Sequence, residues 1–177
     1  ASKARQYFEK AVQLDPHNKE AISDLFDYYM EAPGFLGGGT EKAAALAERS
    51  RELDGAEYHY YLARLAEKRK DFQTAEKEYR RAAELAPNQA GRLIDLARFL
   101  SKRGRFAESD ATFQRAEKIA PDTPKLLFAR ASTYIRAKRN QSVARGLLEQ
   151  YLKSSLTPED PSRREAERLL KEVRSGG

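Results

Sequence analysis

Two histidines, His17 and His59, are the side chains of this sequence best suited to proton transfer or metal binding near neutral pH. They stand far apart in the chain, and no set of His, Asp and Glu residues has the spacing of a metal site. The chain contains no Cys, which excludes disulfides, thiolate metal sites and a cysteine nucleophile. We therefore expect both histidines to be structural, and we predict a protein that is not an enzyme and needs no cofactor.

A glycine-rich stretch at 32–40, with Lys42 just behind it, is the other place where chemistry is conceivable. Glycine backbones at a helix N-terminus can hold phosphate, but no strand is expected before this stretch and the spacing of a phosphate-binding loop is absent. Its four glycines and one proline exclude a helix, and Thr40 is expected to cap the helix that follows. Two interpretations stay open: a latch for a partner or a neighbouring repeat, or a surface insertion whose apolar residues fold back. The latch would consist of Pro33, Gly34, Phe35 and Leu36.

The elements that must position these residues follow from a pattern of small and aromatic residues that returns after 34 residues. A period of this length is typical of stacked helix pairs. In each pair the apolar residues recur at steps of three and four, so neither helix buries its stripe without its neighbours. The three copies of the pattern are Ala4-x3-Phe8-x2-Ala11-x4-Pro16, Ala75-x3-Tyr79-x2-Ala82-x4-Pro87 and Ser109-x3-Phe113-x2-Ala116-x4-Pro121.

On these residues the chain resembles the tetratricopeptide repeat family over nearly its whole length. The resemblance implies an all-α, right-handed superhelical solenoid of helix pairs that acts as a non-catalytic scaffold for proteins or peptides. Phe26 departs from the family pattern, because it falls where a small residue allows close helix packing, and Arg130 replaces a large apolar residue. We predict one domain over 1–177: the second helix of a truncated repeat (1–17), a repeat with the insertion (18–55), two regular repeats (56–89 and 90–123), a degenerate repeat (124–156), and a capping helix with a tail (157–177).

The buried stripes of two repeats can be specified further. In the repeat at 56–89, the first helix is expected to bury a stripe that includes Leu62, Ala63 and Ala66. In the repeat at 124–156 the second helix fits the pattern only with one inserted residue. That register places Ala144, Leu148 and Tyr151 on its buried face.

Equivalent positions of successive first helices predict a binding groove. In the family that the chain resembles, these helices line a concave face, so residues 34 apart form rows across it. The rows are Tyr60, Ile94 and Phe128; Arg64, Arg98 and Ser132; and Lys68, Lys102 and Arg136. They predict an apolar floor and a basic wall, suited to a protein or peptide segment with acidic and apolar residues. The alternative is that the first row only packs between neighbouring helices.

Net charge is uneven along the chain, at −3 over residues 1–55, +4 over 56–121 and +5 over 122–177. A basic majority of the chain favours an acidic partner, although a solvated Arg-rich surface is the plainer interpretation. Nucleic acid is the alternative partner, since three basic turns recur near the repeat spacing and need only phosphate contacts. No aromatic platform for base stacking accompanies these turns. They are Lys68-Arg69-Lys70, Lys102-Arg103-Arg105 and Lys138-Arg139.

The sequence leaves compartment and oligomeric state open. No apolar run is long enough to predict a transmembrane segment, so we expect a soluble protein, either cytoplasmic or exported if an upstream signal was removed. The helix with Ala4, Phe8 and Ala11 lacks the first helix of its pair, and its uncovered face would expose apolar surface. Removal of upstream chain is the favoured explanation, and a homo-oligomer through this truncated edge is the alternative.

Overall fold

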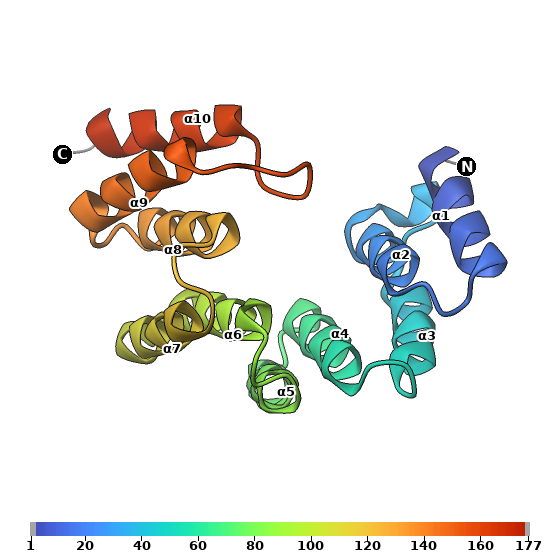
Figure 1. Cartoon of the computed structure of the whole chain (residues 1–177). Helices are drawn as coiled ribbons and strands as arrows, with labels where there is room; N and C mark the ends of the chain where they lie inside the picture. The colour runs from blue at the N-terminus through green and yellow to red at the C-terminus, as the bar shows by residue number, and fades with distance from the viewer. Residues whose placement is uncertain (1–2, 176–177) are drawn as a thin grey trace. The chain divides into compact units, whose positions relative to one another are not determined.

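The computed structural model of this chain describes residues 3–175, with side chains through Val173, and the regular elements of these residues are all helices (Figure 1). The chain divides into two compact units, residues 1–86 and 87–177. The predicted all-α fold of helix pairs is confirmed, since each predicted repeat at 18–55, 56–89, 90–123 and 124–156 contains two α-helices. That all repeats continue as a single domain stays a prediction.

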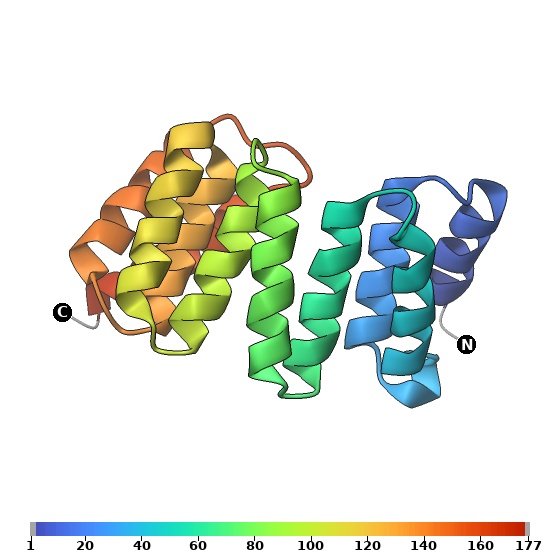
Figure 2. The ribbon, with the colours of Figure 1, turned by 90° about the horizontal axis from the view of Figure 1, so that it is seen from below.

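The first unit contains five α-helices and one short 3₁₀ helix among its described residues. These are α1 (Lys3–Leu14), α2 (Lys19–Glu31), η1 (Gly34–Leu36), α3 (Thr40–Ser50), α4 (Gly55–Lys68) and α5 (Phe72–Leu85). Figure 2 shows α4 and α5 side by side along their length. Asn18 caps α2 by accepting a hydrogen bond from the backbone N–H of Ala21, and Asp54 and Asp71 cap α4 and α5 in the same way.

The core of the first unit forms where the apolar stripes of α1 to α4 meet. Phe26 and Tyr61 are fully buried at its centre, surrounded mostly by aliphatic residues and alanines. The remaining buried members include Val12, Ile22, Leu25, Met30, Ala43, Leu46, Ala47 and Leu65. Leu62, which we expected in the core stripe, is only half-buried, whereas Tyr61 and Leu65 are buried, so the buried face of α4 is displaced from the predicted one.

The glycine-rich stretch is an ordered turn, and two expectations about it are wrong. Residues 34–36 form a 3₁₀ helix because Gly37, at φ 93°, closes it with a hydrogen bond to the Gly34 carbonyl. Thr40 is the first residue of α3 and the cap position belongs to Gly39, whose backbone N–H donates to the Tyr29 carbonyl. The stretch is thus tied to α2 through backbone hydrogen bonds.

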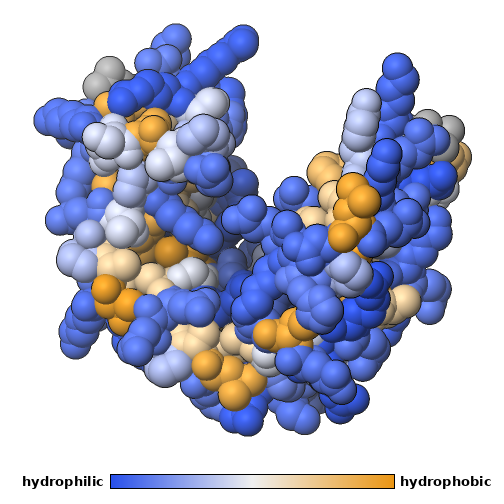
Figure 3. Space-filling model, turned by 45° about the vertical axis from the view of Figure 1, so that its right-hand side comes forward, coloured by the Kyte–Doolittle hydropathy of each residue, from blue (hydrophilic) through white to orange (hydrophobic). Residues whose placement is uncertain are grey.

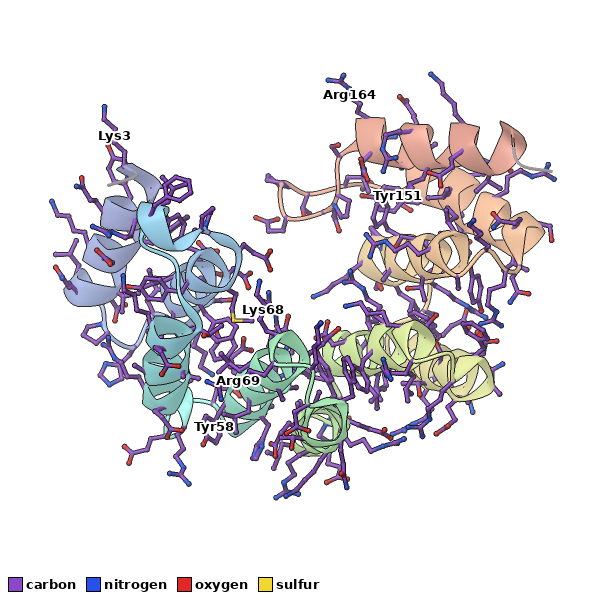
Figure 4. All side chains as sticks on the ribbon, turned by 180° about the vertical axis from the view of Figure 1, so that it is seen from behind. Lys3, Tyr58, Lys68, Arg69, Tyr151 and Arg164 are labelled. Atoms are coloured by element: carbon purple, nitrogen blue, oxygen red, sulfur yellow. The ribbon has the colours of Figure 1, made fainter. Side chains whose placement is uncertain are left out.

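The second unit contains five α-helices among its described residues. These are α6 (Ala90–Lys102), α7 (Phe106–Ile119), α8 (Pro124–Arg136), α9 (Gln141–Lys153) and α10 (Arg163–Ser175). Ala144, Leu148 and Tyr151 are fully buried, which confirms the register with one inserted residue. The Tyr151 hydroxyl donates to the Pro161 carbonyl, and Figure 4 shows Tyr151 beside the segment that leads to α10.

The helix α10 covers α9 with one apolar face. Its buried residues are Ala166, Leu169, Leu170 and Val173, and Arg164 projects away from them (Figure 4). Ser162 accepts a hydrogen bond from the backbone N–H of Glu165 at the start of the helix. This element therefore supplies the apolar cover that a terminal repeat lacks.

Candidate functional site

A pocket of about 300 Å³ lies in the second unit between α6, the start of α7 and the end of α8. Arg98 and Lys102 are four residues apart on α6 and therefore share a face, while Arg136 comes from the last turn of α8. Phe106, at the first position of α7, supplies an apolar wall. The other lining residues are Ser101, Gly104, Thr133 and Ala137.

The pocket is electropositive, because three cations and no carboxylate line it. Among the described residues, neither Arg98 nor Arg136 has a carboxylate within ion-pair distance. Asp95 lies one turn before Arg98, and burial raises the pKa of its carboxyl although Arg92 approaches to 3.2 Å. The whole second unit carries 19 Lys and Arg against 11 Asp and Glu, which strengthens this positive field.

The two predicted cations of the first unit have internal partners instead. Arg64 pairs with Asp27 and Glu31 of α2, and its guanidinium stacks over the Phe26 and Tyr60 rings at 5.4 and 5.7 Å. Burial acts to lower the pKa of Arg64, but the charges of Tyr60 and Asp27 and the hydrogen bond to Asp27 outweigh it and raise the pKa overall. Lys68 donates to the Met30 carbonyl, and Figure 4 shows it at the end of α4 beside α2. Both side chains therefore join α4 to α2.

The predicted apolar row is distributed between surface and core. Tyr60 and Phe128 are half-buried and pack against the core of their own units. Ile94 is 2% exposed, and Ser132 from the second row is also buried, with its hydroxyl donating to the Ala129 carbonyl. Neither Ile94 nor Ser132 offers its side chain to a ligand in this structure, because each packs within the helices.

The residues of the predicted latch lie at the surface. Phe35 is 86% exposed, so it does not fold back onto the helices as the insertion hypothesis expected. The turn beneath it is fixed by two side chains, since the Tyr28 hydroxyl donates to the Leu36 carbonyl and Lys42 donates to the Gly37 carbonyl. Pro33 and Gly34 are exposed as well. The loop thus presents an aromatic ring on a hydrogen-bonded turn.

The basic turns form ion pairs with nearby carboxylates. Arg69 lies 3.9 Å from Glu41, Arg105 pairs with Glu108, and Arg139 pairs with Asp110. The remaining turn residues are Lys68, which donates to the Met30 carbonyl, and Lys70, Lys102, Arg103 and Lys138. At least three of the eight cations in these turns therefore have a carboxylate partner within the chain.

The histidines have structural surroundings. The Nδ1 atom of His59 lies 2.5 Å from Oε2 of Glu78 on α5, and His17 is exposed in the turn between α1 and α2. Within residues 3–175, no three His, Cys, Asp or Glu side chains are grouped as a metal site requires.

The helices of this same range are all too short or too polar to cross a bilayer. Hydrophilic residues cover most of the face seen in Figure 3.

One residue of the pocket, Phe106, was missed at the level of sequence, although a signal for it exists. Phe72 and Phe106 stand one repeat apart, each at the first position of a second helix. The predicted rows consist of positions on the first helices, so this row of second-helix positions lies outside them. Gly104, in the turn before α7, adopts φ 75° and brings Phe106 to the pocket wall.

Antiparallel helix pairs with a shared core and charged, open surfaces define a helical repeat protein, a class that serves as a scaffold for other proteins. Three sequence models, each described as tetratricopeptide repeat, match residues 65–133, 37–90 and 1–18. The chain belongs to the tetratricopeptide repeat family. No curated protein sequence matches it significantly.

Several solved structures have folds similar to that of this chain. YrrB, described as a TPR protein with an unusual peptide-binding site, is 16% identical, with a TM-score of 0.55 over 98% of this chain and 82% of its own. MamA is 20% identical, with a TM-score of 0.51 over 88% and 87% of the two chains. Yeast Tom70 is 16% identical, with a TM-score of 0.54 over 99% and 44%. At these identities the likeness concerns the fold alone.

Proposed function

We propose that the protein is a non-catalytic scaffold whose second unit binds a peptide segment with acidic and apolar side chains in the pocket between α6 and α8. The observation that carries this proposal is the lining of the pocket, which contains the cations Arg98, Lys102 and Arg136 and no carboxylate side chain, and in which neither Arg98 nor Arg136 has a carboxylate within ion-pair distance among the described residues. A carboxylate from a partner would gain charge-assisted hydrogen bonds there. Its insertion would also relieve the mutual repulsion of the three cations.

The apolar part of the ligand would rest on Phe106, which is 38% exposed. The guanidinium of Arg139 lies 4.8 Å from the centre of this ring and supports its far side. A volume of about 300 Å³ lies at the small end of the range for ligand sites, so it fits one or two side chains. The rest of a bound segment would lie along the helix surfaces outside the pocket.

The exposed loop at 33–36 is proposed as a second, separate contact on the first unit. Phe35 is an exposed aromatic residue on a turn that hydrogen bonds hold in place, so a partner would bury it with little loss of conformational entropy. Tyr60 of the predicted groove is proposed as a weaker contact, since only part of its ring is accessible.

The experiment that tests the proposal is a fluorescence anisotropy titration with three labelled peptides of equal length. The first carries Glu and Leu residues, the second has Lys in place of Glu, and the third has Ser in place of Leu. We expect the Glu–Leu peptide to bind most tightly and to lose at least about tenfold in affinity, about 1.4 kcal/mol, in the Arg98→Glu/Arg136→Glu variant.

The matched control is Arg115→Glu/Arg145→Glu, which also reverses two exposed arginines of the same unit, on α7 and α9, neither of which lines the pocket. Equal losses in this control and in the pocket variant would refute the proposal, because they would show that net charge alone attracts the peptide. An affinity for the Glu–Leu peptide that stays unchanged in the Arg98→Glu/Arg136→Glu variant would refute it as well. Single-stranded RNA added as a competitor tests the nucleic-acid alternative, which predicts displacement that weakens steeply with salt.

A further inference from the structure

An open groove of about 560 Å³ lies in the first unit, where α3 and α5 flank α4. Its floor is apolar and is made mainly of small side chains, and its rim is acidic. The floor residues are Ala44, Ala45, Leu62, Leu65 and Ala66. The rim residues are Glu41, Glu48, Arg69, Asp71, Thr74 and Glu78, so four carboxylates face one guanidinium.

The equivalent surface of the second unit is filled by the chain itself. Two repeats after Leu62 and Ala66, the corresponding positions on α8 hold Arg130 and Tyr134. Arg130 donates to the Tyr134 hydroxyl and pairs with Glu117 of α7 at 3.3 Å. At these two positions α8 therefore carries large side chains that are hydrogen-bonded to each other. In the first unit, α4 carries the aliphatic side chain of Leu62 and the methyl group of Ala66 at the same positions. The open groove therefore depends on the particular side chains of the first unit, and helix pairing alone does not produce it.

A second difference between the units concerns the flanking helix. Asp110 of α7 occupies the position that corresponds to Ala44 of α3, and it pairs with Arg139. In the first unit, Ala44 has only a methyl group at this position and is partly buried against the core, whereas Ala45 is exposed. Apolar surface in the floor is therefore available to a partner.

The charged side chains of the rim form only a few hydrogen bonds and ion pairs within the chain. Glu48 accepts from the Tyr58 hydroxyl and lies 3.8 Å from Arg51, while Glu78 contacts His59. Arg69 and Glu41 are 3.9 Å apart, with 57% and 93% of their side chains exposed, so solvent screens this pair. Each carboxylate keeps lone pairs for further cationic donors.

We propose that this groove binds a partner segment in which Lys or Arg side chains alternate with small or aliphatic ones. Aliphatic side chains would cover the floor over Ala45 and Leu62, and the cations would reach the carboxylates on both flanks, such as Glu48 and Glu78. The first unit as a whole has 16 Asp and Glu against 14 Lys and Arg, so its field also favours a cationic ligand. The chemistry is opposite to that of the pocket beside Arg98, and this site is independent of it.

The test uses the full chain and fluorescence anisotropy with the Lys–Leu, Glu–Leu and Lys–Ser peptides. Two substitutions obstruct the groove by different means: Leu62→Arg introduces the residue that fills the equivalent surface of α8, and Ala45→Arg places a cation on the exposed flank of α3. Asp24→Asn, which removes an exposed charge on α2, is the matched control. Circular dichroism verifies that each variant keeps its helices.

We expect the Lys–Leu peptide to bind the wild-type chain and the control equally, and to lose at least about tenfold in affinity in both groove variants. Arg98→Glu should leave this binding unchanged, whereas it weakens the Glu–Leu peptide. The proposal is overturned if the Lys–Leu peptide does not bind, or if it binds Leu62→Arg and Ala45→Arg as tightly as wild type. It is also overturned if these variants change only the sedimentation coefficient, because the occupant would then be a second copy of the chain.

Discussion

Phe26 of α2 and Tyr61 of α4 stack with their ring centroids 3.9 Å apart and their planes at 19°. Both rings are fully buried, and Arg64 covers the outer face of Phe26. Phe26 stands where the family usually has a small residue, so a large ring at this position needs a flat neighbour to lie against. Tyr61 supplies that neighbour, and the pair fills the space between the two helices.

Truncation of this pair should be costly. Phe26→Ala would leave a cavity beside Tyr61, and we expect the free energy of unfolding to fall by about 3–5 kcal/mol. Phe26→Leu, which keeps most of the volume, should cost less than half of that. Urea unfolding followed by circular dichroism measures both, and equal stability of Phe26→Ala and wild type would contradict the packing described here.

Three of the four turns within helix pairs share a left-handed residue one repeat apart, at Lys70, Gly104 and Lys138, with φ of 62°, 75° and 52°. Glycine adopts this conformation without steric cost, but lysine does not. Lys138→Gly should therefore stabilise the second unit by about 0.5–1 kcal/mol, and Gly104→Ala should destabilise it by a similar amount. Thermal unfolding of both variants is the measurement. The explanation would be refuted if the two substitutions shifted the melting temperature in the same direction.

The Asp110–Arg139 pair should make stability depend on pH. Burial raises the pKa of Asp110, but hydrogen bonds from Arg139 and Tyr134 outweigh this effect and hold the pKa below its usual range. Because the pKa of Asp110 is lowered in the folded state, the pair stabilises the protein fully at pH values above the pKa of an unfolded Asp, about 3.9. That stabilisation disappears as the pH falls through the pKa that Asp110 has in the folded protein.

Asp110→Asn should therefore cost about 1–2 kcal/mol at neutral pH, and the difference from wild type should shrink below roughly pH 4. Urea unfolding of the two proteins across this pH range is the measurement. A difference that stays constant down to the acid limit would show that the Asp110 carboxylate does not titrate as described.

Glycine is required at one position of the loop before α3. A Cβ atom on Gly38 would lie 1.9 Å from the carbonyl oxygen of Ala32, so Gly38→Ala should lower the free energy of unfolding by about 1–3 kcal/mol. Gly34→Ala is the matched control, because no atom lies within 4 Å of its Cβ position, and its effect should stay within about 0.5 kcal/mol. Chemical denaturation separates them, and equal effects would disprove the close approach.

The fold could be predicted because its determinants are local and repeated. The spacing of Ala75, Tyr79 and Ala82 and its return 34 residues later indicated the helix pairs, and all three side chains are buried as expected. The one inserted residue before Tyr151 could also be recognised from the spacing of buried positions. Each of these inferences depends on helical periodicity alone.

The site was less predictable, because it depends on which side chains meet. Arg64 and Arg98 occupy equivalent positions, yet Arg64 pairs with Asp27 and Glu31 whereas Arg98 lines a pocket. The difference arises from carboxylates on α2, a neighbouring helix that the row of equivalent positions does not include. Ile94 is buried for a similar reason, since burial depends on what packs against α6 as well as on its own periodicity.

The central claim, that the pocket beside Arg98 recognises a carboxylate of a bound peptide, is tested most directly by a charge-swap cycle. Affinities are measured for wild type and Arg98→Glu, each with the Glu–Leu peptide and with versions that carry Lys at one Glu position. We predict that one Lys position restores at least about tenfold of the affinity lost in Arg98→Glu while it weakens binding to wild type, a coupling of about 1.4 kcal/mol or more. Purely additive effects at every peptide position would contradict the claim, because they would show that Arg98 makes no direct contact with the ligand.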